Sequence, residues 1–237
     1  MLTKAECVAY RDFVDRYQSY VFPLLGARMT RMIGPLESSA HLVDMGTGPG
    51  YLSVELAART GAIVHAVDIN PAMHEIARSV AEERGQTASI RFDHEDVHQL
   101  SYASGFAAAV VSYSCFHHWA QPVRAMAEIW RVLAPGGHLI LLDTNPLGRE
   151  FLAAMSRIVV EREYFRFIEE AIHESLPPSG VAEIARAAGL TGFSIDEFEF
   201  DDEDLLECAE ELEDAPILED LPQERVCWSL TARKPLP

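Results

Sequence analysis

The sequence predicts a doubly wound α/β fold with a seven-stranded, mostly parallel sheet. Between residues 41 and 143, short apolar or β-branched segments alternate with stretches of helical periodicity. This alternation is typical of parallel strands joined by right-handed crossover helices that cover both faces of a sheet. Beyond residue 190, two further apolar segments, 191–200 and 225–232, predict an antiparallel hairpin at the edge of that sheet.

The N-terminal stretch is expected to be helical. Residues 4–33 carry apolar side chains at helical spacing, and we expect Pro23 to break or kink this stretch into two helices. Strands and helices of the parallel core then alternate over residues 39–145. The strands are expected at 41–45, 62–67, 89–93, 107–112 and 138–143, and the helices at 51–60, 71–84 and from Pro122 to the turn at Pro135-Gly136-Gly137.

Helical periodicity returns after the core. Residues 146–178 contain one long helix or two shorter ones, and we expect them to form a helical cap together with residues 1–38. Residues 179–237 are expected to supply a short helix ending at Gly189, an acidic segment and the two edge strands. A chain of 237 residues without a visible linker or repeat predicts a single domain, 1–237.

The charge of the chain excludes one class of partner. The net charge is −18, and 14 of the 37 acidic residues lie between Asp196 and Asp220, a stretch without Lys or Arg. Nucleic-acid binding requires a basic surface, so nucleic acid is not an expected partner. The acidic stretch is interpreted as a solvated helix face or loop; the alternative is that it repels anionic partners or attracts a cationic one.

Targeting and metal signals are also lacking. No apolar run approaches the length of a membrane span, and the N-terminus has no apolar core of a secretory signal. The four cysteines (Cys7, Cys115, Cys208 and Cys227) show no C-x-x-C spacing. This pattern predicts a reducing, cytoplasmic compartment and no metal site.

The glycine-rich segment Val43-Asp44-Met45-Gly46-Thr47-Gly48-Pro49-Gly50 follows the first predicted strand. Such a turn lies at the carboxyl edge of a parallel sheet, where ligands bind, and glycine allows close approach of the backbone. The spacing is G-x-G-x-G, and Tyr51 occupies the position where a dinucleotide fingerprint requires glycine. A nucleoside ligand is the functional reading, and simple turn chemistry is the alternative.

Two acidic residues support a nucleoside ligand. Asp68 ends the second predicted strand, where a carboxylate can accept hydrogen bonds from both ribose hydroxyls. Asp96 follows the third strand, where it could accept from an adenine amine. The alternatives are a helix N-terminal charge for Asp68, since Asn70-Pro71 follow, and an exposed loop residue for Asp96.

At these positions the sequence resembles the class I S-adenosylmethionine-dependent methyltransferases, which have a Rossmann-like core. The resemblance is strong over residues 41–145 and weak over 179–233. Val43 to Gly50 is similar to their glycine-rich motif, Val67-Asp68 to their acidic strand end, and Glu95-Asp96-Val97 to their adenine-contact segment. The run from Phe116-His117-His118-Trp119 to Gly137 is similar to the ubiquinone/menaquinone-biosynthesis-like, small-molecule branch.

The resemblance implies S-adenosyl-L-methionine as cofactor. It implies that Asp44 orients the glycine loop near the methionine amino group, that the loop glycines wrap the methionine and ribose, and that Asp68 holds the ribose. Ile69 and Met73 would pack on the adenine. The implied cofactor-binding residues are Asp44, Gly46, Thr47, Gly48, Gly50, Asp68, Ile69, Met73, Asp96, Val97 and Ser112.

The expected reaction is in-line methyl transfer to a small-molecule acceptor. Alignment and exclusion of water do much of the work, and a general base is needed only for a nucleophile of high pKa. The candidate bases are His117, which we favour, His118, Tyr113 and Tyr20. The candidate substrate contacts in the cap, which could equally be packing residues, are Tyr17, Tyr20, Arg28, Arg157, Tyr164 and Arg166.

Two other functions stay open at this stage. A binding module of the same fold would hold the cofactor without turnover. A dinucleotide-dependent oxidoreductase is disfavoured by Tyr51, because the third glycine of its fingerprint is missing.

Overall fold

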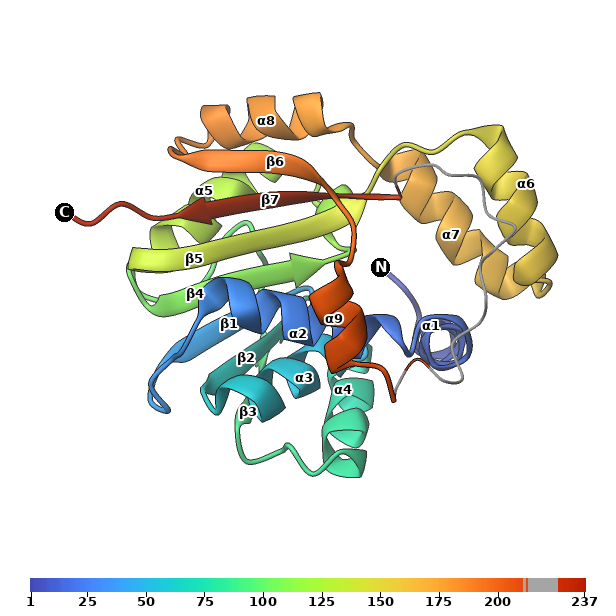
Figure 1. Ribbon diagram of the computed structural model, residues 1–237, viewed down its shortest axis with the longest axis horizontal. Helices are drawn as coiled ribbons and strands as arrows, with labels where there is room; N and C mark the ends of the chain where they lie inside the picture. The colour runs from blue at the N-terminus through green and yellow to red at the C-terminus, as the bar shows by residue number, and fades with distance from the viewer. Residues whose placement is uncertain (211, 213–225) are drawn as a thin grey trace.

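A twisted seven-stranded sheet forms the centre of the protein (Figure 1). The computed structural model describes residues 1–210, 212 and 226–237. The strands lie in the order β3-β2-β1-β4-β5-β7-β6, and the first five of these are parallel. Their bounds are β1 His41–Met45, β2 Ile63–Asp68, β3 Ile90–His94, β4 Ala107–Tyr113, β5 Leu133–Thr144, β6 Phe193–Phe198 and β7 Cys227–Arg233.

The C-terminal edge of the sheet is antiparallel, as predicted. Strand β7 pairs with β5 and with β6 in antiparallel register. Strand β5 starts at Leu133, five residues before the predicted start, and bends at a register irregularity opposite Ala107 and Ala109. The predicted doubly wound fold with an edge hairpin is therefore confirmed.

Helices cover both faces of the sheet. On one face, α2 (Val21–Ile33), α3 (Tyr51–Thr60) and α4 (Pro71–Glu83) pack over strand residues such as Leu42 and Val64. On the other face, α5 (Pro122–Val132) and α8 (Pro178–Ala187) pack over the alternate residues. Successive side chains of a strand point to opposite faces, so strands buried on both sides are apolar throughout.

The break between the first two helices differs from the prediction. Helix α1 (Lys4–Tyr17) begins with a capping box between Thr3 and Glu6, and the chain turns at residues 18–20. Helix α2 begins at Val21, so Pro23 lies in its first turn rather than at the break. A proline in the first turn removes no intrahelical hydrogen bond, because those N–H groups have no partner there.

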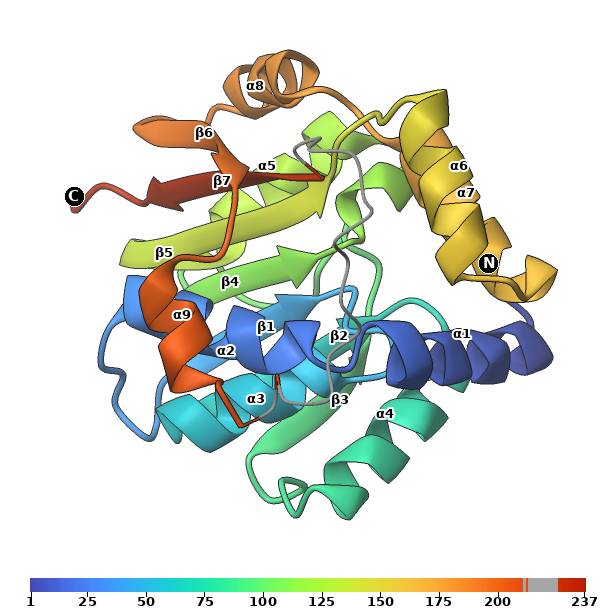
Figure 2. The same ribbon diagram turned by 45° about the vertical axis from the view of Figure 1, so that its right-hand side comes forward.

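Helices α1, α6 (Arg149–Ile158) and α7 (Arg162–Glu174) lie over the carboxyl ends of the parallel strands (Figure 2). Aromatic rings join α1 to α7: the ring centroids of Tyr10 and Phe167 are 5.1 Å apart, and those of Phe13 and Phe167 are 5.9 Å apart. Of the cap predicted over residues 1–38, α1 covers this edge, whereas α2 packs beside α3 on a face of the sheet.

Part of the acidic segment is buried, contrary to its interpretation as a solvated face. Asp204, in α9 (Asp202–Glu207), is fully buried and pairs with Arg28 (2.5 Å) and Arg31 (2.6 Å) on α2. The cationic partner of the segment thus lies within the same chain. The rest of the predicted stretch at 211 and 213–220, and the predicted strand start at 225, fall outside the described residues.

Within the described ranges, none of the helices combines the length and apolarity that a bilayer crossing requires.

Candidate active site

A cavity of about 1290 Å³ opens at the carboxyl edge of the parallel strands, under α1, α6 and α7. Strands β1 and β4 are neighbours in the sheet although they are not consecutive in the chain. This is the point where the strand order reverses, and the segments that follow two such strands diverge to leave a crevice. The loop after β1 and the residues after β4, including the short helix η1 (Phe116–His118), both line the cavity.

The glycine loop is held against the end of β2. The N–H groups of Gly46 and Thr47 both donate to the carbonyl oxygen of Val67, each at 2.8 Å. Gly46 has φ +75°, and a Cβ there would lie 2.1 Å from the Sγ of Cys115. Gly48 has φ +51° and lines the cavity, where a Cβ would lie 4.0 Å from the ring of Tyr10. Gly46 is required because a Cβ would clash with Cys115. Gly48 is required because its φ is positive and because a side chain there would enter the cavity.

Asp44 holds the glycine loop in place through side-chain hydrogen bonds. Its carboxylate is buried and accepts hydrogen bonds from the hydroxyls of Ser53 (2.7 Å) and Thr47 (2.9 Å). Burial raises the pKa of Asp44 from 3.8 to about 6, against the lowering effect of these two hydroxyls. The structure thus places Asp44 where it orients the loop, while the cavity wall itself is formed by Gly46, Thr47 and Gly48.

The raised pKa of Asp44 makes stability depend on pH. Between the unfolded value of 3.8 and the folded value of about 6, the folded state keeps a proton that the unfolded state has lost. The contribution of Asp44 to the free energy of unfolding is therefore complete below pH 4 and falls as pH rises to 6, by on the order of 2–3 kcal/mol. In Asp44→Asn this fall is expected to disappear, as measured by urea unfolding at pH 4 and pH 7.5. An equal fall in both proteins would contradict the raised pKa.

Asp68 joins the glycine loop to the start of α4. Its Oδ2 accepts the N–H of Gly48 at 3.0 Å, and its Oδ1 accepts the N–H of Asn70 at 2.8 Å. Burial raises the pKa of Asp68, and these two backbone hydrogen bonds oppose that rise. Asp68 lines the cavity, and each of its oxygens keeps a lone pair for a further donor.

The predicted adenine side of the site lines the same cavity. Ile69, Met73, Asp96 and Val97 are all part of its wall. The Ile69 side chain is 48% exposed, and Met73 is buried beneath the cavity floor at 5%. Asp96 accepts the backbone N–H of His98 at 2.9 Å, and this hydrogen bond is the main reason that its pKa is lowered. Asp96 is thus an exposed loop residue, 47% accessible at the side chain, whose carboxylate is fixed by this hydrogen bond.

Ser112 and Gly50, two of the predicted cofactor contacts, are not part of the cavity wall. Ser112 is buried within β4 and donates its hydroxyl hydrogen to the carbonyl oxygen of Met45 at 2.6 Å, linking β4 to β1. The residues after it, Tyr113 to Cys115, form the wall instead. Gly50 begins α3 at φ +88°, and a Cβ there would lie 2.8 Å from that of Ala77. Its role is close packing of α3 against α4.

His117 is paired with a buried carboxylate from the neighbouring strand. The distance from its Nδ1 to Oδ1 of Asp143, in β5, is 2.7 Å, and both side chains are 2% exposed. The backbone N–H of His117 also donates to Oδ2 of Asp143, at 3.1 Å. Because a carboxylate oxygen only accepts, Nδ1 carries the hydrogen and the lone pair is on Nε2. His117 lines the cavity, so this pair is the best-oriented base in the site.

The other candidate bases are less suited to this role. Tyr20 and Tyr113 line the cavity, but burial raises the pKa of both phenols. They therefore stay protonated at neutral pH and can donate a hydrogen bond rather than accept a proton. His118 also lines the cavity, and its Nδ1 lies 2.8 Å from Oε2 of Glu174.

The predicted cap contacts divide into two groups. Tyr17 and Arg166 line the cavity, as does Tyr20. Arg28 instead pairs with Asp204, and Arg157 is exposed on α6. Tyr164 packs against Phe13, with ring centroids 6.2 Å apart, as part of the α1–α7 contact.

Two carboxylates of the site were missed in the sequence. Asp143 ends the predicted strand 138–143 and is the last residue but one of β5, which pairs with β4; an acidic residue at the end of an apolar strand is a signal that could have found it. Glu174, the last residue of α7, is one acid among several on that helix and has no such signal.

Comparison with known proteins agrees with this geometry. A family model described as a methyltransferase domain matches residues 43–141, from β1 to β5. A demethylmenaquinone methyltransferase of Thermus thermophilus is 28% identical over 194 residues, which cover 76% of this chain and 87% of the relative. Neither a dinucleotide-dependent oxidoreductase nor a non-catalytic binding module finds support in these matches.

Solved structures share the fold. A protein of Methanococcus maripaludis, described as an S-adenosyl-L-methionine-dependent methyltransferase, superposes with a TM-score of 0.71 at 19% identity, covering 99% of this chain and 94% of that one. Phosphoethanolamine N-methyltransferase 2 of Haemonchus contortus, in complex with S-adenosyl-L-methionine, superposes with a TM-score of 0.67 at 18% identity, covering 98% and 57%. The methyltransferase-domain match, the methyltransferase relatives and the shared fold together support a class I S-adenosylmethionine-dependent methyltransferase.

Proposed function

We propose that this methyltransferase acts on a small molecule with an apolar body, and that His117 activates the accepting atom. The observation that carries the proposal is that His117, paired with the buried Asp143, lines the same cavity as the glycine loop and Asp68. The residues predicted to hold the nucleoside and the proposed base therefore line one cavity. The domain division into a core at 39–145, caps at 1–38 and 146–178 and a C-terminal part at 179–237 belongs to the same proposal.

The residues at the glycine loop fit the cofactor. Gly48 leaves the backbone open to a ligand, and Asp68 offers two oxygens that each have one lone pair free. Ile69, Met73 and Val97 provide an apolar surface for a flat base, and the Asp96 carboxylate lies beside them in the cavity wall. When bound, S-adenosylmethionine supplies a methyl group already activated by its positive sulfur.

Beyond the nucleoside residues, apolar and aromatic side chains form much of the cavity wall, together with charged ones such as Arg166 and Glu170. Side chains from four helices contribute to it, and Phe151, Phe167 and Phe22 are each at most 9% exposed. The wall on this side includes Phe13, Tyr17, Tyr20, Phe22, Phe151, Met155 and Phe167. Such a wall favours a flat or apolar acceptor and excludes water from the reacting atoms. The name of the Thermus thermophilus relative, which refers to demethylmenaquinone, is consistent with an acceptor of this kind.

His117 can take a proton from the acceptor. Asp143 fixes the ring through two hydrogen bonds, one to Nδ1 and one to the backbone N–H, so the orientation of Nε2 is set before an acceptor enters. A base that is positioned in advance contributes typically 10²–10⁴-fold to a rate.

Asp68→Ala is expected to weaken S-adenosylmethionine binding by about 1–3 kcal/mol, because the ribose hydroxyls lose their acceptor. Isothermal titration calorimetry measures this directly. Asp93→Asn is the matched control, since Asp93 lies near the end of the next strand but does not line the cavity. Equal affinity of wild type and Asp68→Ala would remove Asp68 from the site.

The proposed function is tested with radiolabelled S-adenosylmethionine and a panel of phenols, quinols, amines and thiols with apolar substituents. We expect the label to pass to one class of acceptor, with release of S-adenosylhomocysteine. Cofactor binding without transfer to any panel member, combined with transfer to a protein or nucleic acid substrate, would contradict a small-molecule acceptor.

A further inference from the structure

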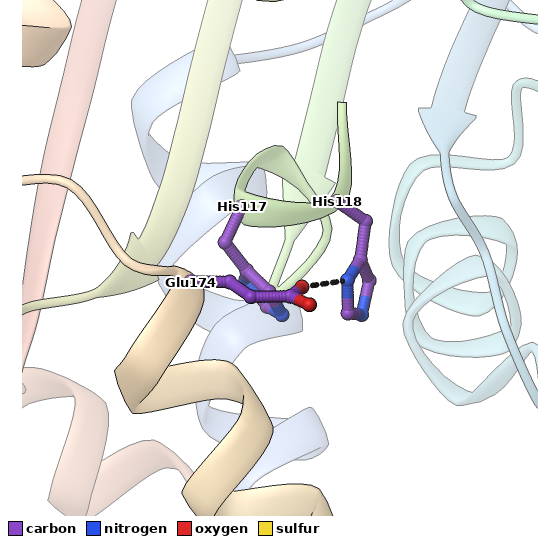
Figure 3. Close-up of side chains that lie close together, drawn as sticks. All are labelled: His117, His118 and Glu174. Carbon is purple, nitrogen blue, oxygen red and sulfur yellow. Dashed lines mark hydrogen bonds and ion pairs between the residues drawn. The ribbon is translucent and has the colours of Figure 1, made fainter. Parts of the chain in front are cut away.

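Three side chains that are common metal ligands meet at the wall of the active-site cavity. His117 and His118 come from η1, and Glu174 is the last residue of α7. One ring nitrogen of each histidine and one carboxylate oxygen lie within 4.8 Å of one another. Figure 3 shows the three side chains close together, with the carboxylate of Glu174 hydrogen-bonded to His118. We propose that this His117–His118–Glu174 cluster binds a divalent metal ion of the zinc type.

The two histidines converge although they are adjacent in the sequence. Consecutive residues of a helix normally point in different directions. In the tight turn of η1, the ring centroids of His117 and His118 are only 4.0 Å apart, at an interplanar angle of 57°. Two imidazole rings this close can each direct one nitrogen towards the same point, as two ligands of one cation do.

Asp143 orients His117 through a hydrogen bond, as carboxylates orient many metal-binding histidines. A histidine that binds a metal through one nitrogen usually donates its other N–H to a carboxylate or a carbonyl. Nδ1 of His117 donates to Asp143 at 2.7 Å, which leaves Nε2 as the ligand atom. Since Asp143 and His117 are both 2% exposed at the side chain, this ligand is rigid before any ion binds.

The other two ligands are able to adjust. Zinc–nitrogen distances of 2.0–2.1 Å in a tetrahedral site place neighbouring ligand atoms about 3.3 Å apart. Nδ1 of His118 and Oε2 of Glu174 are 2.8 Å apart, and their side chains are 57% and 47% exposed. Small rotations of the His118 and Glu174 side chains can therefore bring all three ligands around one ion. The ion then takes the place of the proton shared by Nδ1 of His118 and Oε2 of Glu174.

The ligand set selects the class of ion. Imidazole nitrogens suit zinc and its neighbours, whereas magnesium and calcium prefer oxygen ligands. Glu170, one turn before Glu174 on α7, lines the cavity as well and adds negative charge nearby. Arg166, four residues before Glu170 on α7, forms ion pairs with Glu6 (2.9 Å) and with Glu170 (3.5 Å).

An ion at this position would also bind the methyl acceptor; this consequence rests on the proposed function. Three protein ligands leave one coordination position open, as in catalytic zinc sites. An acceptor hydroxyl held there would have its pKa lowered and would release its proton to the solvent that reaches the half-exposed His118 and Glu174 side chains. His117 would thus activate the acceptor by holding the ion when the ion is bound, and by taking the proton itself when it is not. An oxygen lone pair then forms the new O–C bond while the S–C bond breaks and leaves its electron pair on sulfur. The inference thus favours an acceptor whose nucleophilic atom can bind zinc as an anion, a hydroxyl or a thiol.

The proposal is tested on the full-length protein after treatment with a chelator. We expect calorimetry with ZnCl₂ to show one ion bound per chain, and Co²⁺ to give the visible absorption of a tetrahedral site. His118→Ala and Glu174→Gln are expected to lower zinc affinity at least about tenfold, and Asp143→Asn to lower it roughly 10- to 100-fold. His173→Ala is the matched control, because His173 is exposed beside Glu174 but does not line the cavity.

The outcomes separate this proposal from the proposed function. Unchanged zinc affinity in both His118→Ala and Glu174→Gln, or the absence of stoichiometric binding, would overturn the metal site while S-adenosylmethionine binding and methyl transfer remain. Loss of zinc binding in these two variants, with calorimetric S-adenosylmethionine affinity unchanged and transfer restored only by added Zn²⁺ after chelation, would support it. A metal-binding protein without methyl transfer to any member of the acceptor panel would contradict the proposed function and leave the metal site intact.

Discussion

Replacing His117 by alanine is expected to lower kcat by roughly 10²–10⁴-fold with little change in S-adenosylmethionine affinity. The reason is that the ring is held by Asp143 at 2.7 Å and lines the cavity, apart from the loop and strand end that would hold the cofactor. Single-turnover kinetics and calorimetry on the same preparation measure the two quantities separately. A kcat equal to that of the wild type would reduce His117 to a scaffold residue.

Asp143→Asn separates a positioning role from a purely structural one. The amide has nearly the shape of the carboxylate, but its NH₂ group can face Nδ1 and favour the ring form in which Nε2 carries the hydrogen. We expect kcat to fall about tenfold or more while KM and the thermal unfolding midpoint stay close to those of the wild type. A parallel loss of stability and kcat would instead indicate that Asp143, which also accepts the N–H of Thr144, mainly holds the strand end together.

Gly48→Val is expected to weaken S-adenosylmethionine binding by roughly 100-fold or more, about 2.7 kcal/mol, without loss of the fold. Valine at φ +51° is strained, and its branched side chain would project into the cavity towards Tyr10. Calorimetry measures the binding, and circular dichroism with thermal unfolding measures the fold.

Gly61→Val is the matched control for this substitution. Gly61 has φ +65° at the end of α3, and a Cβ there would meet no atom within 4 Å. It therefore carries a similar backbone strain, about 1–2 kcal/mol, at a position remote from the cavity. If Gly61→Val weakens binding as much as Gly48→Val does, the effect comes from instability and the loop does not contact the cofactor.

Two parts of the predicted cofactor site, the glycine loop and Asp68, could be predicted from the sequence for different reasons. The glycine loop could be predicted because its function depends on neighbours in the chain: the turn, the positive φ and the strand before it are all local. Asp68 could be placed at the same edge because the carboxyl ends of parallel strands come together wherever the strands are correctly identified.

Ser112 shows where that reasoning fails. Its position near the end of β4 was correct, but one residue along a strand reverses the direction of the side chain, so Ser112 bonds to Met45 while Tyr113 lines the cavity. Pro23 is a second case, since a proline alone does not distinguish a helix break from a first turn.

The alternation of strands and helices, the antiparallel edge and the glycine loop could be predicted from the amino-acid sequence, because spacing and backbone preference are local properties. The pairing of Asp143 with His117, the approach of Glu174 to His117 and His118, and the burial of Asp204 against Arg28 and Arg31 became visible in the folded protein alone. These partners are 26 to 176 residues apart in the chain. Their meeting depends on how helices pack over the sheet, which no local pattern encodes.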